Sequence, residues 1–177
     1  MMNRWLRENK VAMWLLTVLR VYIGFQWIEG GWGKLTGGFD ATGFLTGAIA
    51  NTGGEHPSVQ AGWGAFLQHF ALPNVELFNI LVPIGEFLVG LGLILGTFTT
   101  VAALMGMVMN FAFLFSGTVS TNPYLLLAEI FIVVAGANAG KVGLDRWVLP
   151  YLKATLFKKH TKHGGTPTAP APDHRAA

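Results

Sequence analysis

Three ionisable side chains lie inside long apolar stretches of this 177-residue sequence: Arg20, Glu86 and Glu129. Asn110 adds an amide in another apolar stretch. Charged groups at such positions are expensive, and they usually face the interior of a helix bundle or a water-filled cavity. A carboxyl group held there could accept or deliver a proton during a reaction. The same carboxyl could instead only hold helices together, and the sequence favours neither interpretation.

Helical phase restricts which of these charges can meet. Arg20 and Lys34 lie on one face of the first apolar stretch, because positions i, i+4, i+7 and i+11 share a face. Glu29 lies nine residues beyond Arg20, which at 100° per residue places it about 180° around the helix. We therefore expect Arg20 to pair with Glu86 or Glu129 on a neighbouring helix.

These residues define a candidate site for ligand binding and proton transfer. We predict catalytic roles for Arg20, Glu86 and Glu129. The candidate ligand-binding residues are polar or aromatic. They lie on two polar faces of the first apolar stretch, on the polar faces of later stretches and, for Trp63, in the segment 36–74: Tyr22, Gln26, Trp27, Glu29, Lys34, Trp63, Asn79 and Asn110. Arg20 and Lys34 could orient an anionic ligand, and the aromatic rings could stack on a flat ring.

Several kinds of redox centre are excluded by the composition. The chain has no cysteine, which excludes disulfides, thiolate-held iron–sulfur clusters and zinc ribbons. All five histidines lie outside the apolar stretches, so we expect no bis-histidine haem and no metal site. No glycine-rich phosphate-binding pattern is present, so we expect no nucleotide. If electrons move through this chain, an organic ligand or a partner subunit must therefore carry them.

The elements that position these residues are membrane-spanning helices. Only 12% of the residues are charged, against roughly 25% in soluble domains. Four apolar runs approach the roughly 20 residues that cross a bilayer: about 11–31, 75–95, 97–115 and 123–139. We predict an all-α polytopic four-helix bundle forming one domain over residues 1–160. The segment 161–177 is rich in Pro, Ala, Gly and Thr, which predicts a disordered tail.

The distribution of basic residues predicts the orientation. Lys and Arg gather before the first span and after the fourth, so both termini should be cytoplasmic. The segment 36–74 then lies outside, and its apolar residues from Ser58 to Leu72 recur at helical spacing. Such an outer amphipathic helix could close over the mouth of the bundle or serve only as a linker. Basic residues do not alternate with aromatics in a stripe, so no nucleic-acid partner is expected.

Four stretches carry a resemblance to a known family: WIEGGWGKL (27–35), GEFLVGLGLILG (85–96), SGTVSTNP (116–123) and GANAGKVGLDRWVLP (136–150). Together they resemble the DoxX/DoxD family of small bacterial membrane proteins. The resemblance implies a four-helix membrane fold and a redox association. DoxD-like members form the large subunit of thiosulfate:quinone oxidoreductase and work with a smaller subunit. A small redox subunit and a second copy of the chain are therefore expected partners besides the lipid bilayer.

Three functions remain open on the sequence. The first is a quinone-linked membrane oxidoreductase component in which the Arg/Glu cluster binds the ligand and handles protons. The second is a non-catalytic subunit that anchors or assembles a redox partner. The third is a small-solute carrier, since intramembrane charges also mark transport pathways. The lack of an inverted repeat makes the carrier the weakest of the three.

Overall fold

A computed structural model describes residues 1–160, and these residues contain helices and no strand. The helices are α1 (Met2–Glu8), α2 (Lys10–Gly37), α3 (Thr42–Ala50), α4 (Ala61–Phe66), η1 (Leu67–Ala71), α5 (Val75–Leu95), α6 (Thr99–Phe115), α7 (Asn122–Ala135), α8 (Ala137–Gly140) and α9 (Asp145–His160). The element η1 is one turn of π-helix that continues α4. The predicted C-terminal tail, 161–177, lies outside the described residues.

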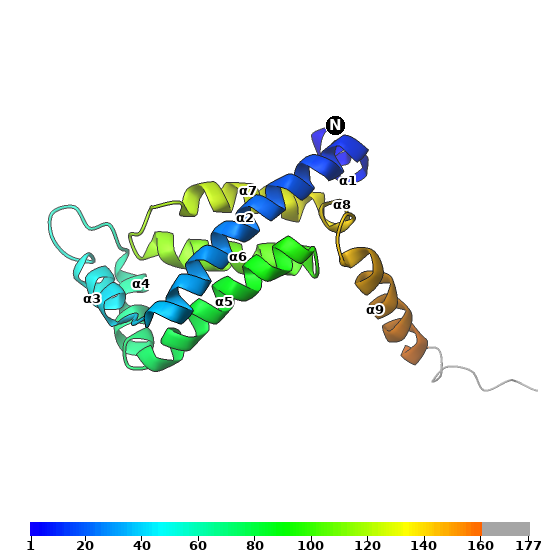
Figure 1. Ribbon diagram of the computed structural model, residues 1–177. Coiled ribbons are helices and arrows are strands. Elements are labelled where there is room, and N and C mark those ends of the chain that lie inside the picture. The colour runs from blue at the N-terminus through cyan, green and yellow to red at the C-terminus, as the bar shows by residue number, and fades with distance from the viewer. Residues whose placement is uncertain (161–177) are drawn as a thin grey trace, which may run out of the picture.

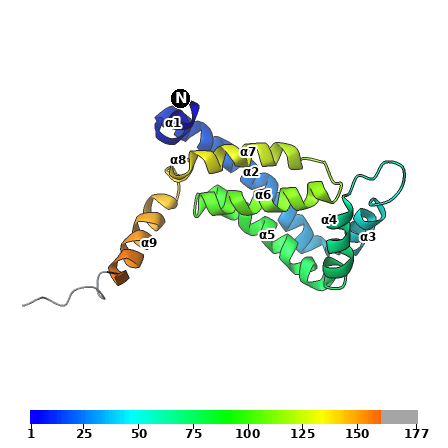
Figure 2. The same cartoon turned by 180° about the vertical axis from the view of Figure 1, so that it is seen from behind.

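Four helices pack side by side to form the body of the chain. Helix α2 packs on α5, α5 on α6, α6 on α7, and α7 again on α2. Figure 1 shows α3 and α4 at one end of this body and α1, α8 and α9 at the other. The view from behind gives the same arrangement, with α9 leaving the body at a steep angle to α6 and α7 (Figure 2). We call the end with α3 and α4 the α3–α4 end.

Two of these helices are long and apolar enough to cross a membrane, namely α2 and α5. Helices α6 and α7 are also apolar but shorter, with 17 and 14 residues. Helix α5 has the bounds expected for the second span. The expected fourth span ends early, because Gly136 takes a positive φ of 57° and separates α7 from α8. Glycine adopts such a backbone without the penalty that a side chain brings.

The segment between α2 and α5 is partly helical, as its apolar spacing predicts. The Asp40 carboxylate accepts hydrogen bonds from the backbone N–H and the hydroxyl of Thr42, at 2.9 and 2.7 Å, where α3 begins. These bonds lower the pKa of Asp40 below its ordinary value. The expected helix over 58–72 forms as α4 and η1. Asn79 on α5 accepts a 2.7 Å hydrogen bond from the Ala41 N–H, which ties the start of α3 to α5.

Helices α2 and α5 approach each other backbone to backbone. A Cβ atom on Gly90 would lie 2.6 Å from the Gly24 carbonyl oxygen, and one on Gly31 would lie 2.5 Å from the Phe87 nitrogen. Both distances are too short for a real side chain, so only glycine fits at these positions. Small residues that let helix backbones approach closely are typical of helix pairs within membranes. The contact fixes the register in which the remaining side chains of α2 and α5 meet.

Replacing Gly90 by alanine tests this contact. We expect Gly90→Ala to destabilise the fold by about 1–3 kcal/mol, as overpacking of a tight interface does. The matched control is Gly33→Ala, because a Cβ there has nothing within 4 Å. Thermal unfolding in detergent should give a lower midpoint for Gly90→Ala and an unchanged or higher one for Gly33→Ala. Equal midpoints for the two variants would contradict the close approach.

Candidate functional site

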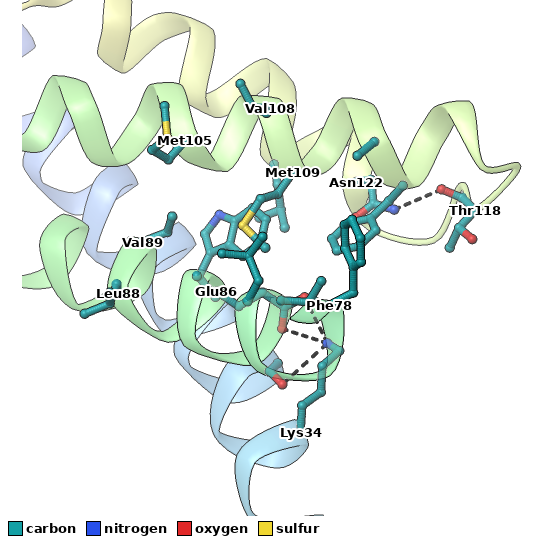
Figure 3. Close-up of a pocket in the computed structure, with 18 of the residues that line it drawn as sticks. Lys34, Phe78, Glu86, Leu88, Val89, Met105, Val108, Met109, Thr118 and Asn122 are labelled. Atoms are coloured by element: carbon teal, nitrogen blue, oxygen red, sulfur yellow. Dashed lines mark hydrogen bonds and ion pairs between the residues drawn. The ribbon is translucent and has the colours of Figure 1, made fainter. Parts of the chain in front are cut away.

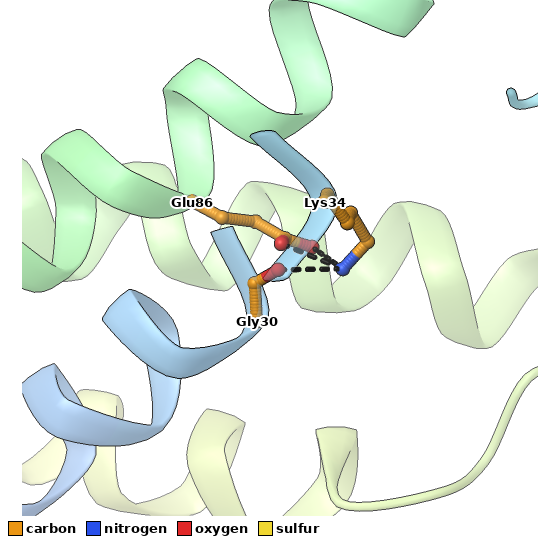
Figure 4. A network of polar contacts seen from close by, with 3 residues as sticks. All are labelled: Gly30, Lys34 and Glu86. Atoms are coloured by element: carbon orange, nitrogen blue, oxygen red, sulfur yellow. Dashed lines mark hydrogen bonds and ion pairs between the residues drawn. The ribbon is translucent and has the colours of Figure 1, made fainter. Parts of the chain in front are cut away.

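A buried ion pair joins α2 to α5 near the α3–α4 end. The Lys34 ammonium lies 2.9 and 2.7 Å from the two carboxylate oxygens of Glu86, and its third contact is the Gly30 carbonyl at 3.5 Å (Figure 4). The side chain of Glu86 is 4% exposed and that of Lys34 is 31% exposed. A Cβ on Gly30 would lie 3.3 Å from the carboxylate, so a glycine leaves room for the pair. The partly exposed Lys34 ammonium can therefore contact a ligand, while the Glu86 carboxylate holds the ammonium in place.

A pocket of about 990 Å³ adjoins this pair. Its walls come from α2, α3, α4, η1, α5, α6 and the beginning of α7, and its lining is mostly apolar. Figure 3 shows Lys34 and Glu86 on one side of the pocket and Asn122 near the start of α7. The volume is at the upper end of the roughly 300–1,000 Å³ typical of small-molecule sites, and apolar walls with a few polar groups are the usual composition of such sites.

The segment between α2 and α5 contributes an aromatic wall to the pocket. Trp63 on α4 lines it and donates a 2.9 Å hydrogen bond from its indole N–H to the Ser116 hydroxyl at the end of α6. Asn122 also lines the pocket and donates a 2.9 Å hydrogen bond to the Thr118 carbonyl. The hydrogen bond of Trp63 ties α4 to the end of α6. The segment 36–74 therefore forms one wall of the pocket and is more than a linker.

A second buried carboxylate lies next to the pocket wall. Glu129 on α7 is fully buried and accepts hydrogen bonds from the Trp27 indole N–H at 2.7 Å and from the Asn110 amide at 2.8 Å. Trp27 also lines the pocket. A Cβ on Gly106 would collide with this carboxylate, so glycine is required there. The Glu129 carboxylate is thus held by two uncharged donors, one of which belongs to the pocket lining.

The expected pairing of Arg20 with Glu86 or Glu129 is wrong. Arg20 is buried, and its guanidinium donates hydrogen bonds to backbone carbonyls: Leu93, Ile94 (3.0 Å) and Val142. The reason is the antiparallel register of α2 and α5. This register places Gly30 beside Glu86. Arg20 lies ten residues before Gly30, about 15 Å closer to the N-terminus of α2, and therefore meets the C-terminal end of α5.

Arg20 belongs instead to a cluster that joins the α5–α6 turn to the start of α9. Asp145 is buried and accepts hydrogen bonds from the N–H groups of Phe98 and Thr99 at 2.7 and 2.9 Å, where α6 begins. The cation lies at the C-terminal end of α5 and the carboxylate at the N-terminal end of α6, which is the favourable arrangement for both helix dipoles. We did not predict Asp145, because it lies outside the apolar stretches.

The remaining predicted residues fall into three groups. Gln26 lines the pocket, as do Trp27, Lys34 and Trp63. Tyr22 and Glu29 are exposed on α2 and are not brought to the pocket, while Asn79 and Asn110 serve the contacts described above. Among residues 1–155, whose side chains the structure describes, no three histidine, aspartate or glutamate side chains gather in a group that could hold a metal ion. The charged side chains that line the pocket are therefore Lys34 and Glu86, and Arg20 does not line it.

The Arg20 cluster predicts a stability effect. Arg20→Met should lower the unfolding free energy by several kcal/mol, because each buried carbonyl left without a donor costs about 1–3 kcal/mol. The control is Arg4→Met, which removes an exposed ion pair to Glu8 that is worth about 0–1 kcal/mol. Chemical denaturation in detergent measures both variants. A similar loss in the two would contradict the placement of Arg20.

Comparison with known protein families shows a resemblance over much of the chain. A family model described as DoxX matches residues 15–119, more than half of the chain. The matched range includes Trp27, Lys34, Trp63 and Glu86, whereas Glu129 lies beyond it. No curated protein and no solved structure matches the chain.

Proposed function

The chain belongs to the DoxX family of membrane proteins, and from this premise we propose that it is an integral-membrane component of a quinone-linked oxidoreductase. The observation that carries the proposal is the pocket of about 990 Å³, whose apolar walls adjoin the Lys34–Glu86 pair. A flat apolar ring with two carbonyl oxygens needs such walls and a few placed donors. The activity proposed is of the thiosulfate:quinone type, with a reduced sulfur compound as the electron donor.

The proposal includes the arrangement in the membrane. Helices α2, α5, α6 and α7 form a four-helix transmembrane bundle, a single domain over residues 1–160. Both termini are cytoplasmic in a bacterial plasma membrane, because the basic residues lie near α1 and α9. The insertion 36–74, with α3 and α4, then lies at the outer face together with the pocket's polar end. Helix α8 extends the short helix α7 toward the inner face.

Lys34 and Glu86 keep the ligand-binding and catalytic roles predicted for them, whereas Arg20 does not line the pocket and takes no part. The Lys34 ammonium can donate a hydrogen bond to a quinone oxygen and stabilise the negative charge that reduction places there. Reduction to a quinol takes up two electrons from the reduced sulfur compound and two protons. The Lys34 ammonium can give one proton to the ligand, and the Glu86 carboxylate can accept a proton and relay it to the Lys34 amine that this leaves. Glu129 lies behind Trp27 and is the second carboxyl that can hold a proton near the ring.

Variants at the ion pair test the proposal. Lys34→Met should weaken the binding of a ubiquinone or menaquinone analogue roughly 10- to 100-fold, because a hydrogen bond from a charged donor contributes about 1.5–3 kcal/mol. The double variant Lys34→Met/Glu86→Gln avoids an unpaired buried carboxylate and should show the same loss. Lys141→Met is the control, because Lys141 is exposed and does not line the pocket.

Binding is measured by titration of the purified protein, and turnover by quinone reduction with thiosulfate in the presence of any co-purified subunit. Loss of binding and turnover in an intact complex supports the oxidoreductase component. Loss of complex recovery in proportion to activity would instead identify the chain as a non-catalytic anchor or assembly subunit. Absence of saturable quinone binding in the unmodified protein would contradict the proposal outright.

A further inference from the structure

The pocket is far longer than a quinone ring. Its lining runs from Thr97 and Phe98 in the α5–α6 turn to Ser116 at the other end of α6. The 17 residues of α6 span roughly 25 Å at 1.5 Å per residue. The Lys34–Glu86 pair and Trp63 lie toward the α3–α4 end of the pocket. The rest of the pocket is an apolar groove between α5 and α6. A ring bound beside Lys34 leaves most of this groove to be filled by something else.

The groove is open on the outside of the body. Its lining includes Leu88 on α5 and Met105 and Val108 on α6, and each of the three is at least half exposed. Figure 3 shows Met105 and Val108 on α6 across from Leu88 on α5. In a bilayer this opening faces the acyl chains, so a ligand can enter sideways from the lipid and needs no path through water.

Small residues set the width of the groove. Gly85 and Gly92 on α5 both line it. A Cβ on Gly85 would lie 3.3 Å from the Met109 sulfur, and a Cβ on Gly92 would lie 3.0 Å from the Ala102 Cβ. A larger side chain at Gly85 would therefore project into the space beside Met109 and narrow the groove. The flexible Met side chain can adjust to a ligand of irregular shape.

We propose that the groove between α5 and α6 holds the long isoprenoid tail of a quinone whose ring lies beside Lys34 and Glu86, so that the protein selects tail-bearing quinones. This inference rests on the proposed function and specifies its substrate class. The continuity of the groove with the polar end of the pocket supports it. Lipid is as apolar as the groove, so the selectivity comes from close packing of the tail against α5 and α6 and not from removal of apolar surface from water.

A series of benzoquinones that differ only in tail length tests the inference. The protein is reconstituted in nanodiscs, and affinity is expressed per mole of quinone in the bilayer, so that partitioning does not contribute. We expect affinity to rise at least about tenfold, or 1.4 kcal/mol, from the tail-less ring to the long-tailed quinones. It should level off once the tail fills the groove.

Two substitutions in the groove should abolish this dependence. Gly85→Phe fills the space beside Met109, and its matched control is Ile84→Phe, the neighbouring exposed residue that does not line the pocket. Met105→Trp covers the open side without disturbing the core, with Leu104→Trp as its control. The groove variants should bind long- and short-tailed quinones alike, while the controls keep the preference of the unmodified protein.

The outcomes separate the inference from the proposed function. If quinones bind but tail length and the groove variants have no effect, the tail site is wrong and the proposed function stands. If no quinone binds at any tail length, the proposed function fails and the tail site fails with it. If the control variants lose the preference as fully as the groove variants, the tail does not lie between α5 and α6.

Discussion

The close approach of the α2 and α5 backbones sets which residues of α5 the polar side chains of α2 meet. Gly24 and Gly31 on α2 meet Gly90 and Phe87 on α5 at distances that leave no room for side chains. Because the two helices are antiparallel, this register places Glu86 beside the turn that carries Lys34. A shift of one helical turn, about 5.4 Å, would separate the ammonium from the carboxylate and leave a buried charge without a partner, which is strongly destabilising.

Three polar sites lie along one face of α2 at steps of seven residues, about 10 Å apart: Arg20, Trp27 and Lys34. At each of these sites the cost of burying a polar group is offset in a different way. Arg20 donates to backbone carbonyls, the Glu129 carboxylate beside Trp27 accepts from uncharged donors, and Lys34 forms an ion pair. Trp27 and Lys34 line the pocket, whereas Arg20 secures the turn between α5 and α6. The polar residues of α2 therefore divide into a structural end and a ligand-binding end.

Helical phase grouped Arg20, Trp27 and Lys34 on one face of α2, because a face repeats every 3.6 residues whatever the neighbouring helix does. It did not choose between this face and the one with Tyr22 and Glu29, which are exposed. It could not predict the partner of Arg20, since phase within one helix carries no information on the register between two helices. Asp145 was missed because it acts as a cap for α6 from outside the apolar stretches. The spacing of apolar residues in 58–72 predicted a helix, but the contact of Trp63 with Ser116 depends on how the loop folds back.

The central claim is that a quinone ring binds in the pocket beside Lys34 and Glu86. Photolabelling with an azido-quinone, followed by mass spectrometry of the peptides, tests it most directly. The account predicts saturable labelling of pocket-lining residues on α5, α6 and α4 that excess unlabelled quinone prevents. Labelling spread over lipid-exposed residues outside the pocket and unaffected by competitor would contradict it.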